Sequence, residues 1–243
     1  MRALRNFGAC DTFRPVRLTL YLQSAAANAV LASCVQPPPF DTTAAAINTP
    51  QTDVASDSAA RVRLIDVHLV EPTIVVDSRY ATSNNFTAAP LPGYEANRAL
   101  LRREAAAALA RVQRRARQEG VALKIFDAYR PVRATQAMME WTQRTGQQQL
   151  VRDGYIASRS RHNLGAAVDL TLIGGDGQEL DMGTPFDTFS AAAHTANATG
   201  QVAVNRALLA RLMQAEGFTG YEKEWWHFSY AVPDPLRFDL VIR

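Results

Sequence analysis

From about residue 61 to the C-terminus, apolar and polar residues recur with the periods of short helices and strands. Between residues 95 and 119 apolar side chains return every three to four positions, with arginines between them, and Gly120 follows. This pattern predicts an amphipathic helix that ends at a glycine. Residues 134–145 and 204–216 predict two further helices in the same way.

Other stretches of this region are short and rich in the residues that favour extended backbone. The predicted strands or extended segments are residues 62–70, 73–76, 121–126, 166–173, 224–230 and 238–242. Because helices and strands alternate irregularly, the order predicts an α+β fold in preference to a doubly wound parallel sheet. About 180 residues suit a single core, so we expect one domain over residues 61–243.

The N-terminal region has a different pattern. Arginines up to Arg17 precede a moderately apolar stretch, residues 18–30, and then Leu31-Ala32-Ser33-Cys34. These four residues resemble a bacterial lipobox, so we predict a lipoprotein-type signal peptide over residues 1–33 and periplasmic localisation with a lipid anchor at Cys34. An ordinary signal peptide, or an amphipathic helix that contains a cysteine, would give a similar pattern.

Residues 34–60 contain three consecutive prolines, scattered Thr, Ser and Ala, and few large apolar side chains. Such a stretch buries too little surface to offset the entropy of ordering it. We therefore predict a flexible tether between the anchor and the domain.

Composition narrows the classes of protein. An apolar fraction of 47% with 20% charged residues is typical of a globular protein. Two cysteines cannot form a disulfide scaffold or a four-thiolate metal site. The net charge of +3 comes from the first 33 residues, beyond which basic and acidic side chains are balanced, so no nucleic-acid partner is expected. The oligomeric state does not follow from the sequence.

Two histidines have neighbours that suit metal chemistry. His162 precedes Asp169 by seven residues, with Gly165 between them, where the chain can turn and bring the two side chains together. His227 follows Glu224 by three residues, a spacing that requires a bend in a strand if both are to face one site. Two imidazoles, one carboxylate and an open position form a catalytic zinc site, although a histidine between aromatics is also common in cores.

Three stretches carry a family resemblance: residues 127–131 (Asp-Ala-Tyr-Arg-Pro), 160–169 and 224–227. They resemble the zinc-dependent D-alanyl-D-alanine dipeptidases of the vancomycin-resistance type, whose wider relatives include D,D-carboxypeptidases and hedgehog domains. Supporting stretches occur in family order at residues 80–82, 85–87, 93–98 and 182–187. The resemblance implies a single domain of the hedgehog/D,D-peptidase fold, with a central, mostly antiparallel sheet and flanking helices.

The resemblance also implies roles for individual residues. His162, Asp169 and His227 would ligate one Zn²⁺. Glu224 would act as general base and then as general acid, and Arg130 would stabilise the oxyanion. His68 and His194 have no comparable surroundings and are predicted to be structural.

The remaining roles concern the substrate. Asp187 and Tyr80 would hold a free ammonium group and Ser160 a terminal carboxylate, although an ion pair for Asp187 and packing or turn roles for the other two are the alternatives. Asp187 favours a dipeptidase that cleaves D-alanyl-D-alanine, in cell-wall turnover or glycopeptide resistance; a D,D-carboxypeptidase that trims stem peptides is the alternative. Two departures from the family concern Ala128, where glycine is common, and a shorter segment between residues 145 and 158.

Overall fold

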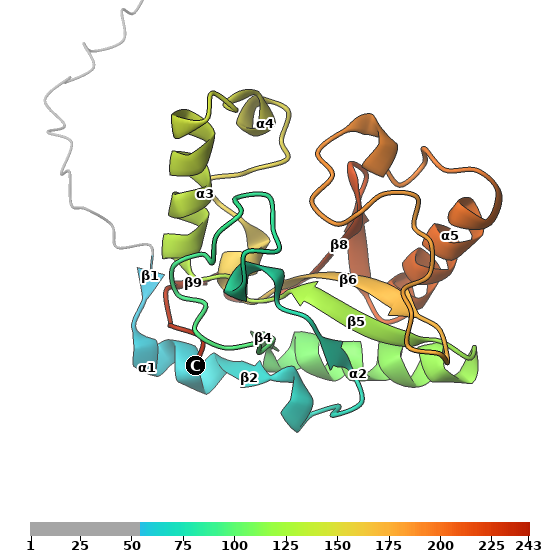
Figure 1. Ribbon diagram of the computed structural model, residues 1–243. Coiled ribbons are helices and arrows are strands. Elements are labelled where there is room, and N and C mark those ends of the chain that lie inside the picture. The colour runs from blue at the N-terminus through green and yellow to red at the C-terminus, as the bar shows by residue number, and fades with distance from the viewer. Residues whose placement is uncertain (1–53) are drawn as a thin grey trace, which may run out of the picture. The chain divides into compact units, whose positions relative to one another are not determined.

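The computed structural model describes residues 54–243 (Figure 1). Its helices are α1 (Asp57–Arg63), α2 (Arg103–Gln118), α3 (Val132–Arg144), α4 (Gln149–Arg152) and α5 (Gly200–Gln214). Its strands are β1 (Val54–Ala55), β2 (Leu64–Asp66), β3 (Val75–Val76), β4 (Leu100–Arg102), β5 (Ala122–Asp127), β6 (Ala167–Ile173), β7 (Phe218–Tyr221), β8 (Glu224–Tyr230) and β9 (Arg237–Phe238). Within these residues no helix has the length and apolarity needed to cross a membrane.

A five-stranded sheet in the order β3-β5-β6-β8-β7 forms the centre of the fold. β3 runs parallel to β5, and the other neighbours are antiparallel. Helices α2 and α5 contact the sheet and each other, whereas α3 and α4 stand apart from them at the left of Figure 1. The predicted α+β class with a mostly antiparallel sheet is confirmed.

Strand β6 lies between β5 and β8, and all seven of its residues are buried. Its apolar side chains Val168, Leu170 and Leu172 belong to the main hydrophobic core. A strand covered on both faces reads as a nearly continuous apolar run, which is why it was recognisable in the sequence. Its polar residues are Thr171 and, near its beginning, Asp169, and both are buried as well.

The predicted helix over residues 95–119 begins only at Arg103. Residues Leu100–Arg102 form strand β4, which pairs antiparallel with β2, and all three are buried. The apolar period continues through this strand because its leucines also face the core, so periodicity alone placed the start of the helix too early. Similarly, the predicted strand over residues 62–70 is limited to Leu64–Asp66 and is followed by a 3₁₀ turn.

The last residues of the predicted tether, 54–60, are folded, which corrects the expected boundary near residue 61. Val54–Ala55 pairs with Arg237–Phe238, and helix α1 begins directly after Ser56. The Ser56 hydroxyl accepts a hydrogen bond from the backbone N–H of Ala59 and so caps the helix. The signal peptide predicted over residues 1–33, Cys34 and the rest of the tether lie outside the described residues.

Candidate metal centre and active site

The segment before β6 directs His162 into the site. His162 lies in a 3₁₀ helix, Arg161–Leu164, whose first turn is capped reciprocally by Ser160 and Asn163. Gly165 ends this helix with φ of 64°. A side chain there would clash with Leu64 and would bring Cβ to 3.2 Å from the backbone nitrogen of Arg102, so both the turn and the space require glycine.

Strand pairing brings the other two predicted ligands together. Asp169 on β6 lies directly opposite His227 on β8 in the antiparallel register. Residues paired in this way point to the same face of the sheet and lie close together. The register therefore places the carboxylate of Asp169 beside the ring of His227, 58 residues later in the chain.

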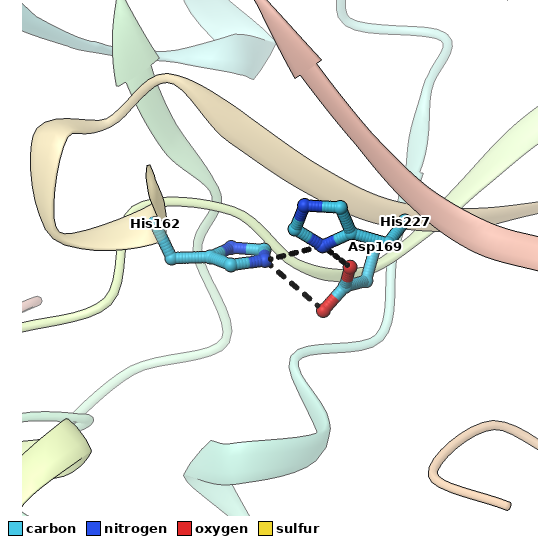
Figure 2. A group of neighbouring side chains, drawn as sticks. All are labelled: His162, Asp169 and His227. Carbon is cyan, nitrogen blue, oxygen red and sulfur yellow. Dashed lines mark hydrogen bonds and ion pairs between the residues drawn. The ribbon is translucent and has the colours of Figure 1, made fainter. Parts of the chain in front are cut away.

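Figure 2 shows the three side chains converging on one point. His162 Nε2 lies 3.1 Å from His227 Nδ1 and 3.3 Å from an Asp169 carboxylate oxygen, and the other Asp169 oxygen lies 2.9 Å from His227 Nδ1. Ligands about 2.0–2.2 Å from a tetrahedral zinc ion are separated by roughly these distances. The three residues form a candidate metal site in which the ligand atoms lie within 4.8 Å of one another.

The protonation states of these residues also suit a metal. The carbonyl of Ala128 lies 2.6 Å from His162 Nδ1, so that nitrogen donates its hydrogen and leaves the Nε2 lone pair facing the site. Burial lowers the pKa of His227 more than the Asp169 carboxylate raises it, which favours the neutral ring. Burial raises the pKa of Asp169, but the two imidazoles more than offset this and keep its pKa low.

Ala128 contributes through its backbone carbonyl and lies in the buried turn after β5. Its φ is not among the positive values of the described residues, so alanine adopts this backbone without the strain that glycine would relieve. The departure from the family's glycine therefore leaves the turn suited to position both His162 and Arg130.

A bulge in β8 accounts for Glu224. Gly220 of β7 pairs with Phe228, but the next residue, Tyr221, pairs with Glu224. The three residues between Glu224 and Phe228 thus have no partner in the ladder with β7, and the bend agrees with the one expected from the spacing of Glu224 and His227. Both side chains line the same pocket.

Glu224 is nearly buried, at 8% exposure. Burial raises the pKa of its carboxyl well above the usual range, and Asp169 and Asp187 raise it further, whereas Arg130 lowers it. A raised pKa makes a carboxyl group a stronger base and brings it closer to the range in which it can both accept and deliver a proton, as a general acid–base requires.

Arg130 is fixed by the turn that carries it. One Asp127 oxygen accepts hydrogen bonds from its Nε at 3.0 Å and from a terminal nitrogen at 2.7 Å, and Tyr94 donates to the other Asp127 oxygen at 2.6 Å. The guanidinium also lies over the Tyr80 ring, 5.1 Å from its centre. Burial lowers the pKa of Arg130, but Asp127 and its other neighbours raise it further, so the side chain stays charged.

Asp187 and Tyr80 meet on another side of the pocket. The Tyr80 hydroxyl donates to one Asp187 oxygen at 3.0 Å, and the other oxygen is buried with no hydrogen-bond partner among the described residues. Burial raises the pKa of Asp187 to about 8. Its backbone has a φ of 62°, which is unusual for a residue other than glycine and is common at functional sites.

Ser160 is half-buried at the edge of the same pocket, where its hydroxyl accepts a hydrogen bond from the His162 backbone N–H at 3.2 Å. The pocket has a volume of about 260 Å³, and all eight predicted site residues line it. Its walls also contain Phe86, which belongs to the supporting stretch 85–87, and Tyr155 and Phe189, which no motif or spacing in the sequence singled out. His194, predicted to be structural, contacts Tyr155 rather than the metal site.

One buried and one half-buried imidazole and a carboxylate, with an acid and an arginine beside them in one small pocket, define a mononuclear metallohydrolase. The family profile described as D-ala-D-ala dipeptidase matches residues 60–236. The chain therefore belongs to the D-ala-D-ala dipeptidase family, which is a family of zinc metallopeptidases.

Several relatives of this chain are D-alanyl-D-alanine dipeptidases. The D-alanyl-D-alanine dipeptidase of Escherichia coli strain K12 is 38% identical over 180 residues, which cover 73% of this chain and 89% of that protein. Those of Enterococcus faecium and Streptomyces coelicolor are 36% and 37% identical over 169 residues, which cover 63% of this chain and 83% and 84% of theirs. The similarity thus spans nearly the whole length of the relatives.

Proposed function

We propose that this chain hydrolyses D-alanyl-D-alanine and similar D,D-dipeptides to free amino acids, with zinc as its metal. The observation that carries the proposal is the unpartnered oxygen of Asp187, buried in the same small pocket as the His162–Asp169–His227 cluster. A buried carboxylate needs a partner, and the free ammonium group of a dipeptide supplies one. The relatives' shared activity supports the same substrate.

His162, Asp169 and His227 would hold the zinc ion. A zinc ion bound there supplies Lewis acidity for the scissile carbonyl and for a water molecule. The Ala128 carbonyl keeps His162 in the tautomer that can ligate, and the sheet register keeps Asp169 against His227. The metal site is therefore assembled by the fold before the substrate arrives.

Glu224 would take the proton from the attacking water and pass it to the leaving amine. Its buried position, with Asp169 and Asp187 nearby, makes the protonated form stable enough for the second step. Arg130 would donate hydrogen bonds to the carbonyl oxygen as negative charge develops, since Asp127 already holds the guanidinium in place. Removing one such donor typically raises the barrier by about 3–4 kcal/mol.

Charge at both ends of the substrate explains selectivity for a dipeptide. Asp187 and Tyr80 would bind the ammonium group, and the Ser160 hydroxyl would bind the carboxylate at the opposite end. A substrate with an acylated amine leaves the Asp187 carboxylate buried without a partner, which costs binding energy. The same site therefore disfavours a peptidoglycan stem peptide, which lacks a free amine next to the scissile unit.

The direct test is the release of free D-alanine from D-alanyl-D-alanine by the purified, zinc-loaded protein. A panel with L-alanyl-L-alanine, N-acetyl-D-alanyl-D-alanine and a stem pentapeptide sets the specificity, and a chelator serves as the metal control. We expect hydrolysis of the free D,D-dipeptide only. Hydrolysis of the pentapeptide without the dipeptide would instead assign the chain to the D,D-carboxypeptidases.

We also propose that the protein is exported and anchored by lipid at Cys34, where it would act on dipeptides outside the cytoplasm. The support is the sequence Leu31-Ala32-Ser33-Cys34 after an arginine-rich start. Labelling cells with a radioactive fatty acid should mark the wild type but not Cys34→Ala, and only the wild type should sediment with membranes. In cells from which the gene has been deleted, loss of growth on D-alanyl-D-alanine would indicate a role in dipeptide turnover. Increased sensitivity of the same cells to a glycopeptide would indicate a role in resistance.

A further inference from the structure

Three aromatic rings form a wall beside Asp187. The Phe86 and Phe189 rings are 5.1 Å apart, and the Phe189 and Tyr155 rings are 5.7 Å apart. All three residues line the pocket, and Phe189 follows Asp187 by two residues. The aromatic wall (Phe86, Tyr155 and Phe189) continues from Tyr80, whose ring lies 6.2 Å from the Phe86 ring and whose hydroxyl donates to Asp187, so the wall begins at the end of the pocket where an ammonium group would bind.

Tyr155 is linked to a segment that is distant in the sequence. Its hydroxyl lies 2.9 Å from His194 Nε2, and the two rings are 6.2 Å apart. Tyr155 belongs to the loop after α4, whereas His194 precedes α5, 39 residues later. Both side chains are half-buried, and neither is needed for the metal cluster or for the hydrogen bonds around it.

The His194 side of this link is fixed by a buried arginine. The guanidinium of Arg206, on α5, donates to the backbone carbonyls of Met182 at 2.8 Å, His194 at 2.7 Å and Ala192 at 3.0 Å. The backbone N–H of Thr195 also donates to the carbonyl of Glu222 at 2.9 Å. His194 is thus presented by a segment that the core and the β7–β8 turn hold in place.

The loop that carries Tyr155 is held by two side chains that donate hydrogen bonds to its backbone carbonyls. Lys223 donates to the Asp153 carbonyl at 2.6 Å, and the Tyr221 hydroxyl donates to the Gly154 carbonyl at 3.2 Å. Tyr221 ends β7 and Lys223 lies in the β7–β8 turn, so the loop that carries Tyr155 is attached to the same turn as the segment that carries His194. The other two hydrogen bonds hold the backbone of the loop, whereas the bond between Tyr155 and His194 holds a side chain of the aromatic wall.

We propose that Tyr155 and His194 are specificity-determining residues that hold the aromatic wall closed and so limit the substrate to a free amine. This inference rests on the proposed dipeptidase function and explains where its length limit arises. An ammonium group is small and fits against Asp187, whereas an acyl group on the same nitrogen must extend into the space that the Phe189 and Tyr155 rings occupy. Loss of the bond to His194 would leave the Tyr155 ring held by its contacts with the Phe189 ring and the Lys223 ammonium group, which would allow it to move aside more easily.

The test measures kcat/KM for D-alanyl-D-alanine and for N-acetyl-D-alanyl-D-alanine in zinc-loaded enzyme. We expect Tyr155→Phe and His194→Ala to raise the ratio of the acetylated to the free substrate about tenfold, the effect of losing one hydrogen bond. His194→Gln, whose amide can still accept from the tyrosine, should restore the wild-type ratio. His68→Ala is the matched control, because His68 also makes one ring hydrogen bond, to the Ile74 carbonyl at 2.9 Å, outside the pocket.

A ratio of two substrates does not depend on the fraction of active enzyme, so a merely structural role cannot move it. If both activities fall in parallel, or if the ratio stays at the wild-type value, the inference is wrong. Tyr155→Phe removes a single oxygen atom and decides the matter should His194→Ala fail to fold. A wild type that does not cleave D-alanyl-D-alanine contradicts the proposed function, whereas an active wild type with unchanged variants contradicts the role of Tyr155 and His194 alone.

Discussion

Individual carboxyl groups in this pocket have pKa values shifted away from those in water. Glu224 and Asp187 have raised pKa values because both carboxyls are buried near other acids. Asp169, also buried, has a low pKa because two imidazoles face it. The pKa values of three carboxyl groups in one small pocket thus differ because each group has different neighbours, and this suits three different roles.

Glu224→Gln should keep zinc and lose turnover. Glutamine has nearly the same shape but cannot accept or deliver a proton, and general acid–base catalysis is worth roughly 10²–10⁴-fold in rate. We expect kcat on D-alanyl-D-alanine to fall by at least this factor while the metal content, measured by atomic absorption, stays at one zinc per chain. Glu222→Gln, at an exposed position on the β7–β8 turn, is the matched control and should retain full activity. Equal losses in both variants would refute the assigned role.

Substrate binding should tighten as the pH rises toward about 8. Burial raises the pKa of Asp187 to about 8, so the free enzyme holds it as the neutral acid at lower pH. An ion pair with the ammonium group requires the carboxylate, so binding releases a proton and KM falls by nearly tenfold per pH unit between about pH 6 and 7. Above about pH 8 the substrate amine loses its own proton and KM rises again.

The measurement is KM from pH 6 to 9 for the wild type and for Asp187→Asn. The variant cannot titrate at this position, so its KM should be higher and should lack the fall between pH 6 and 8. A fall that persists in Asp187→Asn would show that another group controls binding.

At the scale of elements, two irregularities place the chemistry. The left-handed turn at Gly165 aims His162 across the end of β6, and the bulge in β8 allows Glu224 and His227 to face the same pocket. The regular pairing of β6 with β8 places the third metal ligand, Asp169, opposite His227. Regular pairing alone would have left Glu224 and His227 on different faces.

Gly165→Ala should therefore damage both stability and metal binding. The new methyl would meet Leu64 and the backbone of Arg102 and would also strain a φ of 64°. We expect the free energy of unfolding to fall by about 2–4 kcal/mol, the combined cost of overpacking and a left-handed alanine. Gly120→Ala has a similar φ of 76° but open space around it, so it should lose only about 1–2 kcal/mol and keep its zinc affinity.

Chemical denaturation and zinc titration measure the two effects. Equal destabilisation of both glycine variants, with unchanged zinc affinity in Gly165→Ala, would mean that the turn does not position His162.

For the whole molecule, the metal site ties together segments that are far apart in the chain. Its ligands come from the 3₁₀ helix before β6, from β6 and from β8. Helix α1 lies outside the central sheet, but its Ala60 belongs to the same cluster of buried apolar residues as Tyr80, which lines the pocket. A ligand that binds only the native state stabilises the whole fold by mass action. Zinc should therefore affect global unfolding and not only activity.

Removal of the metal should lower the unfolding temperature cooperatively. With free zinc at about 100 times its Kd, the native state gains roughly 2.7 kcal/mol over the chelated protein. Thermal melts with zinc or with chelator should show this difference in the wild type, and His162→Asn should abolish it. His68→Asn, remote from the ligands, should retain the zinc-dependent shift; its loss there would argue against the assigned site.

The sequence by itself determined the α+β class, the main helices and strands β5, β6 and β8, because apolar periodicity is a local property of the chain. It also indicated all the residues of the metal cluster, because residues 160–169 and 224–227 carry the family resemblance. Helix α1, strand β4 and strand β7 were not readable, since a short polar segment or a helix-like apolar run becomes ordered only against partners distant in sequence.

Only the tertiary structure decided how the pocket is enclosed. The orphaned oxygen of Asp187 depends on burial, and the bond between Tyr155 and His194 joins two distant segments, so no spacing in the sequence reveals either of them. Burial and partners set the charge and position of a side chain, and both depend on the packing of the whole domain. The residue types specify which chemistry is available, and the fold selects the substrate that can reach it.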